Sequence, residues 1–124
     1  MTLNEPVVIT GFMGCGKTEV ARQLAQRLKI EMADLDELIT RTEGMTPARL
    51  IRERGERAFR TIETGVLNLL LNRNTAGVIA LGGGAWIESV NREVIRNTGA
   101  ISVWLDTPFD ICWERIVAST EIGR

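Results

Sequence analysis

One segment of the sequence has glycines, a lysine and a threonine at the spacing of a phosphate-binding loop. Residues 11–18 read Gly-Phe-Met-Gly-Cys-Gly-Lys-Thr and match GxxxxGK[ST] in full. Glycines at these positions let consecutive backbone N–H groups converge on phosphate oxygens, while the lysine bridges two phosphates and the threonine hydroxyl reaches Mg²⁺. A tight glycine turn without a ligand would leave Lys17 unexplained, so the segment predicts a nucleoside triphosphate site.

Two aspartates alternate directly after a short apolar segment. Asp34 and Asp36 stand in Ala-Asp-Leu-Asp-Glu-Leu-Ile. Ligands of open α/β sheets bind beyond the carboxyl ends of the strands, so we expect these carboxylates to serve Mg²⁺ and a substrate hydroxyl. The alternative is that they cap a helix that begins at Glu37.

Two further features each admit two interpretations. Arg60 and Glu63 are spaced to share one face of a helix, but a pair at this spacing is usually a solvated surface ion pair. Gly82, Gly83 and Gly84 follow an apolar segment. Three consecutive glycines let backbone amides approach a ligand closely, or they form a flexible loop.

The composition excludes several kinds of chemistry and of partner. The 124 residues include no His, which excludes Ser-His-Asp and Cys-His nucleophiles and HExxH zinc sites. A formal net charge of -1 creates no global field for nucleic acid or an anionic membrane, so we expect neither partner. Cys15 and Cys112 form no CxxC pair, and the N-terminal segment lacks the pattern of a signal peptide. We therefore expect a reduced, cytoplasmic protein, in which Cys15 is a small side chain tolerated in a crowded loop rather than a redox group.

The segments between these residues alternate between strand and helix patterns. We expect strands at 6–10, 30–33, 77–81 and 101–105, and helices at 17–28, 37–42, from Thr46-Pro47, from Phe59 to Leu71, at 91–96 and after Pro108. The helix from Phe59 to Leu71 carries apolar residues, Leu69 among them, on more than one face, so we expect it to be buried on two sides. The alternation predicts a single α/β domain with a parallel sheet between helices.

Taken together, the segments GFMGCGKT, DLD, GERAFRTIE, LGGGA and VWLDTP, in this order, closely resemble the shikimate kinases over essentially the whole chain. The resemblance implies a three-layer P-loop kinase fold of the nucleoside-monophosphate-kinase-like group. Residues 1–124 would form a single kinase domain, in which residues 34–63 include the helical part that binds shikimate. The implied activity is MgATP-dependent phosphorylation of the 3-hydroxyl of shikimate, on the pathway to chorismate and aromatic amino acids, by a monomer.

The resemblance also implies roles for individual residues. Lys17, Asp36 and Arg124 would be catalytic, with Asp36 accepting the proton and Arg124 reaching over the transferring phosphoryl group. Arg60 would clamp the substrate carboxylate, and Glu63 would orient Arg60. The remaining assignments are ATP contacts at Gly14, Cys15, Gly16, Lys17, Thr18, Val20, Arg115 and Arg124, shikimate contacts at Asp36, Arg60, Gly82, Gly83 and Gly84, and Mg²⁺ contacts at Thr18 and Asp34.

Shikimate kinases continue beyond the position of Arg124. They have a LID segment, a helix with a second carboxylate-binding arginine, a last strand and an adenine-contacting loop, so we expect the fold to lack its C-terminal elements. One alternative is therefore a non-catalytic nucleotide-binding relative or an inactive shortened species. Another is a kinase for a different small hydroxylated acid or sugar, which the match of DLD, Arg60 and the three glycines disfavours.

Overall fold

The computed structural model describes residues 5–11, 16–72, 77–106 and 114. Strands and helices alternate along this part of the chain, as the sequence predicts. The helix expected after Pro108 lies outside the described residues. The elements are β1 (Val7–Gly11), α1 (Lys17–Leu28), β2 (Glu31–Asp34), α2 (Leu35–Glu43), α3 (Pro47–Arg54), α4 (Glu56–Leu71), β3 (Gly77–Ala80), α5 (Gly83–Ile87), α6 (Ser89–Asn97) and β4 (Ile101–Leu105).

The four strands form one parallel sheet in the order β2-β3-β1-β4. In this register Ile9 of β1 lies beside Ala80 of β3, and Ala80 lies beside Asp34 of β2. Parallel strands bring their carboxyl ends to a single edge of the sheet. The start of the phosphate-binding loop, the first aspartate and the glycine segment therefore meet at that edge, where open α/β sheets bind their ligands.

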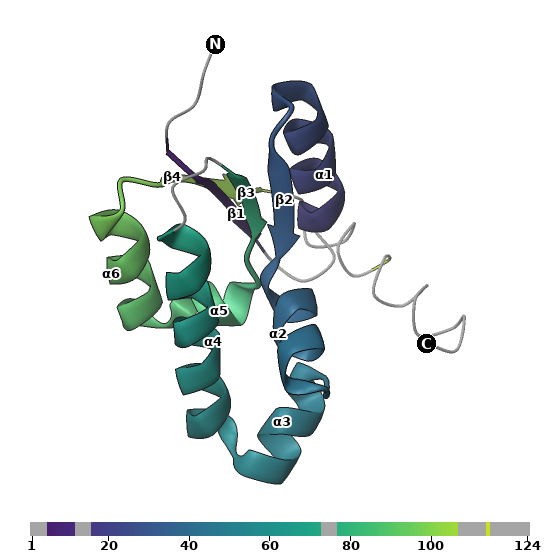
Figure 1. Cartoon of the computed structure of the whole chain (residues 1–124), viewed down its shortest axis with the longest axis vertical. Coiled ribbons are helices and arrows are strands. Elements are labelled where there is room, and N and C mark those ends of the chain that lie inside the picture. The colour runs from purple at the N-terminus through teal and green to yellow at the C-terminus, as the bar shows by residue number, and fades with distance from the viewer. Residues whose placement is uncertain (1–4, 12–15, 73–76, 107–113, 115–124) are drawn as a thin grey trace.

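Helices cover both faces of the sheet, so the fold has three layers. Successive residues of β1 point to opposite faces. Val7 and Ile9 pack with Ala21 and Ala25 of α1, whereas Val8 packs in a separate cluster formed mainly by α2, α3, α4 and α6. Figure 1 shows α1 on one side of the sheet and α4, α5 and α6 on the other, with α2 and α3 extending beyond the carboxyl ends of the strands. The expected parallel sheet flanked by helices is confirmed.

Three helices differ from the expectation: α5, which was not expected, and α4 and α2. The prediction that α4 is buried on two sides is wrong at Leu69, whose exposed fraction is 72%. Buried residues of α4 recur at Phe59, Glu63, Val66 and Leu70, which is the spacing of one helix face. Helix α2 begins at Leu35, two residues earlier than expected, because the side chain of Asp34 caps it by accepting from the N–H of Glu37.

Within the described parts of the chain, no helix has the length and apolar character that a membrane span requires.

Candidate active site

The junction of β1 and α1 has the geometry of an anion site. Gly16 immediately precedes α1 with φ of 88°, a left-handed conformation that favours glycine. No side chain among the described residues caps the first turn of α1, so its N–H groups are available to a phosphate oxygen. Lys17 and Thr18 are the first two residues of that helix, and both are partly buried. Gly14 and Cys15 lie outside the described residues.

Thr18 and Asp34 are in direct contact across the junction of α1 and β2. The Thr18 hydroxyl donates a hydrogen bond to Oδ2 of Asp34 at 3.0 Å, and Oδ1 of Asp34 accepts one from the N–H of Glu37 at 3.1 Å. Asp34 therefore caps α2 while it faces the start of α1. The two side chains present hard oxygen ligands of the kind that Mg²⁺ binds. The described residues contain no group of three or more His, Cys, Asp or Glu that could hold a metal ion.

Asp36 lies in the first turn of α2, whereas the sequence analysis placed it before the helix. The idea that Asp36 is the helix cap is wrong, because Asp34 has that role. An ideal Cβ atom on Gly82 would lie 3.7 Å from Oδ2 of Asp36, so this carboxylate is next to the glycine segment. Burial raises the pKa of Asp36 above its ordinary value and the charge of Asp34 adds to the rise, while Lys17 and Arg60 act in the opposite direction.

Arg60 and Glu63 form an ion pair that is largely removed from solvent. Nη1 of Arg60 lies 2.9 Å from Oε1 of Glu63, and the exposed fractions of the two side chains are 25% and 3%. The interpretation as a solvated surface pair is therefore wrong. Burial raises the pKa of Glu63 although Arg60 favours the charged form. Burial by itself lowers the pKa of Arg60, but the hydrogen bond and charge of Glu63, with the charges of Glu88 and Glu56, produce a net rise.

A buried asparagine that the sequence analysis missed supports this pair. Asn91 is fully buried, donates to the Ala85 carbonyl at 3.0 Å and accepts from the Thr64 hydroxyl at 2.6 Å. A further side-chain hydrogen bond from Asn91 favours the charged form of Glu63. Asn91 thus joins α4 to α5 and α6 behind the ion pair. Its position four residues before buried Ile95, on the core face of α6, was the available sequence signal.

The three glycines do not form a flexible loop, because Gly83 and Gly84 are the first two residues of α5 and Gly82 precedes it. An ideal Cβ atom on Gly83 would lie 3.2 Å from the carbonyl oxygen of Gly11, and one on Gly84 would lie 3.0 Å from Nη2 of Arg60. The close-approach interpretation fits this geometry. Because Gly83 and Gly84 have no side chains, α5 can lie close to both Gly11, at the start of the phosphate-binding loop, and the Arg60 guanidinium.

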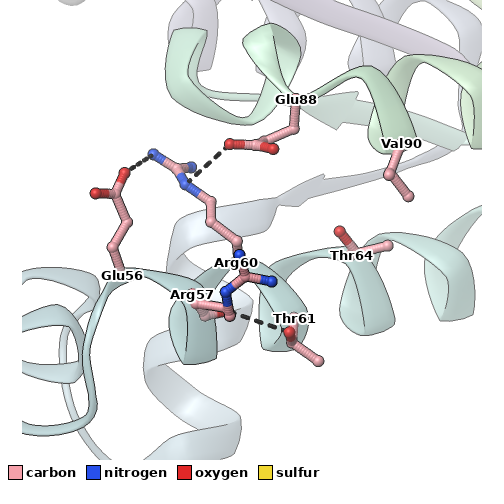
Figure 2. Close-up of a pocket in the computed structure, with 7 residues that line it drawn as sticks. All are labelled: Glu56, Arg57, Arg60, Thr61, Thr64, Glu88 and Val90. Carbon is pink, nitrogen blue, oxygen red and sulfur yellow. Dashed lines mark hydrogen bonds and ion pairs between the residues drawn. The ribbon is translucent and has the colours of Figure 1, made fainter.

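A pocket of about 540 Å³ lies beside α4 and the start of α6 (Figure 2). Asp36 and Thr18 do not line it, and Arg60 is the residue that belongs both to this pocket and to the site described above. Figure 2 shows Glu56 and Glu88 pointing at the Arg60 guanidinium from two sides. Each carboxylate lies 3.7 Å from an Arg60 nitrogen. The pocket residues are Glu56, Arg57, Arg60, Thr61, Thr64, Glu88 and Val90.

Comparison with known proteins shows the family to which this chain belongs. A family model described as shikimate kinase matches residues 13–124. The chain belongs to the shikimate kinase family. A curated shikimate kinase from Cereibacter sphaeroides is 41% identical over 114 residues, which cover 92% of this chain and 56% of that protein. A shikimate kinase from Persephonella marina is 33% identical over 115 residues, which cover 93% of this chain and 69% of that protein.

A solved structure of a shikimate kinase has the same fold. The shikimate kinase from Acinetobacter baumannii in complex with shikimate is 38% identical, with a TM-score of 0.85 over 96% of this chain and 65% of that chain. The present chain thus spans little more than half the length of curated shikimate kinases such as the Cereibacter protein.

The shikimate kinase resemblance also implied nucleotide contacts at Val20, Arg115 and Arg124. Arg115 and Arg124 are outside the described residues. Val20, in the second turn of α1, has an exposed fraction of 40%.

Proposed function

We propose that the protein is a shikimate kinase that transfers the γ-phosphoryl group of ATP to the 3-hydroxyl of shikimate, giving shikimate 3-phosphate and ADP. The observation that supports this proposal most directly is the grouping of Asp36 and the Arg60–Glu63 pair around the glycines at the start of α5. This group lies next to Lys17 and Thr18. One edge of the sheet thereby combines groups for a triphosphate, a hydroxyl and a carboxylate.

The nucleotide end of the site uses the start of α1. Its uncapped N–H groups and the Lys17 ammonium would bind the phosphates. The oxygens of Thr18 and Asp34 are suited to hold Mg²⁺, directly or through water. The bound ion would neutralise charge on the phosphates and help to align them. The protein then contributes mostly positioning and electrostatic stabilisation, as phosphoryl transfer requires.

Asp36 is the proposed proton acceptor. A general base works best when its pKa lies nearer to the working pH, and burial with the adjacent Asp34 charge shifts the pKa of Asp36 in that direction. As the substrate oxygen forms its bond to phosphorus, its proton would pass to the Asp36 carboxylate. The chain contains no His, so a carboxylate is the appropriate group for this step.

Arg60 is the proposed anchor of the substrate carboxylate. A planar guanidinium can form two parallel hydrogen bonds with a carboxylate. Glu63 and the wall of α5 hold Arg60 in one orientation, which reduces the entropy lost on binding. The presence of shikimate in the related Acinetobacter baumannii structure supports this choice of substrate. A cytoplasmic location and a monomeric state stay predictions of the same proposal.

A coupled assay of ADP release tests the proposal. With the protein expressed from its complete reading frame, ADP release in MgATP should depend on added shikimate. Lys17→Ala should abolish it, and Arg60→Ala should mainly raise the KM for shikimate. Arg57→Ala, in the same turn of α4, serves as the matched loss of positive charge. Shikimate-independent ADP release, or activity with another hydroxylated acid alone, would overturn the choice of substrate, and ATP binding without turnover would indicate a non-catalytic relative.

A further inference from the structure

The guanidinium of Arg60 is flanked by three carboxylates that approach different nitrogens. Glu63 lies 2.9 Å from Nη1, Glu56 lies 3.7 Å from Nη2, and Glu88 lies 3.7 Å from Nε. The first contact is a hydrogen bond. The other two distances are too long for one, although they lie within the range of an ion pair.

The hydrogen bond to Glu63 leaves one edge of the guanidinium for a ligand. A carboxylate can bind arginine through two neighbouring N–H groups, and Nε and Nη2 form such a pair on the side of the guanidinium where the Glu63 bond is not made. Nε is buried and has no hydrogen-bond partner among the described residues. A buried donor of this kind is costly unless an acceptor arrives. The edge that lacks an acceptor is also the edge that Glu56 and Glu88 approach.

Glu88 has no other evident structural task in the described part of the chain. It immediately precedes α6, but its side chain does not cap that helix. Its exposed fraction is 43%, compared with 69% for Glu56 at the same distance from Arg60. Solvent therefore screens the charge of Glu88 less than that of Glu56. Glu88 also approaches Nε of Arg60, which has no hydrogen-bond partner among the described residues.

We propose that Glu88 is an affinity-determining residue that competes with the carboxylate of the substrate for the Nε edge of Arg60. The inference rests on the proposed function, in which Arg60 binds that carboxylate. Glu63 orients Arg60 from the buried side, while Glu88 places a negative charge where the negative end of the ligand must arrive. Binding then requires the Glu88 carboxylate to move toward solvent, and a ligand without a carboxylate does not meet this barrier.

Calorimetric titration of shikimate into wild type, Glu88→Gln and Glu88→Ala tests the competition. Both variants should bind shikimate about three- to tenfold more tightly than wild type, and Glu56→Gln should show a smaller gain. In about 0.5 M NaCl the differences should shrink, because the Debye length falls. The methyl ester of shikimate, which has no carboxylate, should bind wild type and both Glu88 variants equally. Changed packing alone would not produce this dependence on salt and ligand charge.

The outcomes separate this inference from the proposed function. If wild type binds shikimate and the Glu88 variants bind it equally or more weakly, Glu88 does not compete, and a weaker affinity would show that it positions Arg60 instead. A gain in affinity that is the same for shikimate and its methyl ester also overturns the inference. If wild type binds no shikimate and shows no shikimate-dependent ADP release, the proposed function fails and the competition fails with it.

Discussion

A Cβ atom on Gly84 would lie 3.0 Å from Nη2 of Arg60, so the backbone at the start of α5 is the wall against which the guanidinium rests. Gly84 belongs to the glycine segment, and Arg60 belongs to α4 and lies 24 positions earlier in the sequence. A side chain at Gly84 would have to displace the guanidinium, so under the proposed function this glycine would set the position of the carboxylate anchor.

Gly84→Ala should weaken shikimate binding about tenfold while leaving the affinity for ATP and the thermal stability nearly unchanged. The added methyl group meets the end of a flexible side chain, which can move at little cost to the fold, but the carboxylate anchor is displaced. Calorimetry with each ligand measures the effect.

Gly65→Ala is the matched control for that substitution. Gly65 is an exposed residue within α4 with no atom near an added Cβ, so alanine should stabilise the protein by about 0.5–1 kcal/mol without changing shikimate affinity. Equal shikimate affinity in Gly84→Ala and wild type would show that α5 does not set the position of Arg60.

Gly83→Ala, in contrast to Gly84→Ala, should affect ATP more than shikimate. Its Cβ would lie 3.2 Å from the backbone oxygen of Gly11, which cannot move as an arginine side chain does. We expect a loss of about 1 kcal/mol in the free energy of unfolding and a larger increase in the KM for ATP than for shikimate, because Gly11 begins the phosphate-binding loop. Urea denaturation and steady-state kinetics measure these effects. Unchanged ATP kinetics would contradict the proposed coupling between α5 and the loop.

Asp34 combines two roles that substitution can separate. Asp34→Ala removes the cap of α2 and should cost about 1 kcal/mol of stability, whereas Asp34→Asn keeps an oxygen that can accept from the Glu37 N–H and should cost less. Both variants should need more Mg²⁺ for half-maximal activity, because both lack the negative charge. If Asp34→Asn retains the Mg²⁺ dependence of wild type, the assignment of Asp34 to the metal is wrong.

Asp36→Asn should stabilise the free protein at neutral pH while it removes most of the turnover. Burial raises the pKa of Asp36 in the folded protein, so the folded state holds this proton more tightly than the unfolded state. The contribution of Asp36 to the free energy of unfolding therefore falls as the pH rises from the unfolded pKa, about 3.9, through the higher folded pKa. The amide variant avoids this loss.

Urea denaturation in EDTA at neutral and acidic pH measures this difference. The advantage of Asp36→Asn over wild type should be full above the folded pKa of Asp36 and should vanish below the unfolded pKa, where the carboxyl group is neutral in both states. A variant that is less stable than wild type at neutral pH would show that the Asp36 charge is favourably compensated in the folded protein.

The parallel sheet, its flanking helices and the neighbourhood of Thr18 and Asp34 follow from local sequence. A β-branched segment before the glycine loop predicts a buried strand, and parallel strands place the ends of β1 and β2 at one edge. The pattern of aspartates does not show which of the two caps α2, and this decides where the helix begins. In the structure Asp34 is the cap, so the helix begins at Leu35, which is fully buried in the core.

The arrangement around Arg60 depends on long-range contacts that local patterns do not contain. The spacing of Arg60 and Glu63 predicts that they meet, but their burial results from α5 and α6, which Asn91 ties to α4. Glycine disfavours helices, so three in succession predict a close backbone approach or a flexible loop rather than the start of a helix. In the folded chain Gly83 and Gly84 nevertheless begin α5, where Gly11 and Arg60 leave little space for a side chain.

Phosphorus NMR of a reaction containing MgATP, shikimate and the protein expressed from its complete reading frame tests the central claim most directly. The account predicts that the γ-phosphorus signal of ATP is replaced by a phosphomonoester signal of shikimate 3-phosphate, with an equal amount of ADP. Unchanged ATP, or ADP formed with inorganic phosphate and no phosphorylated shikimate, would contradict it.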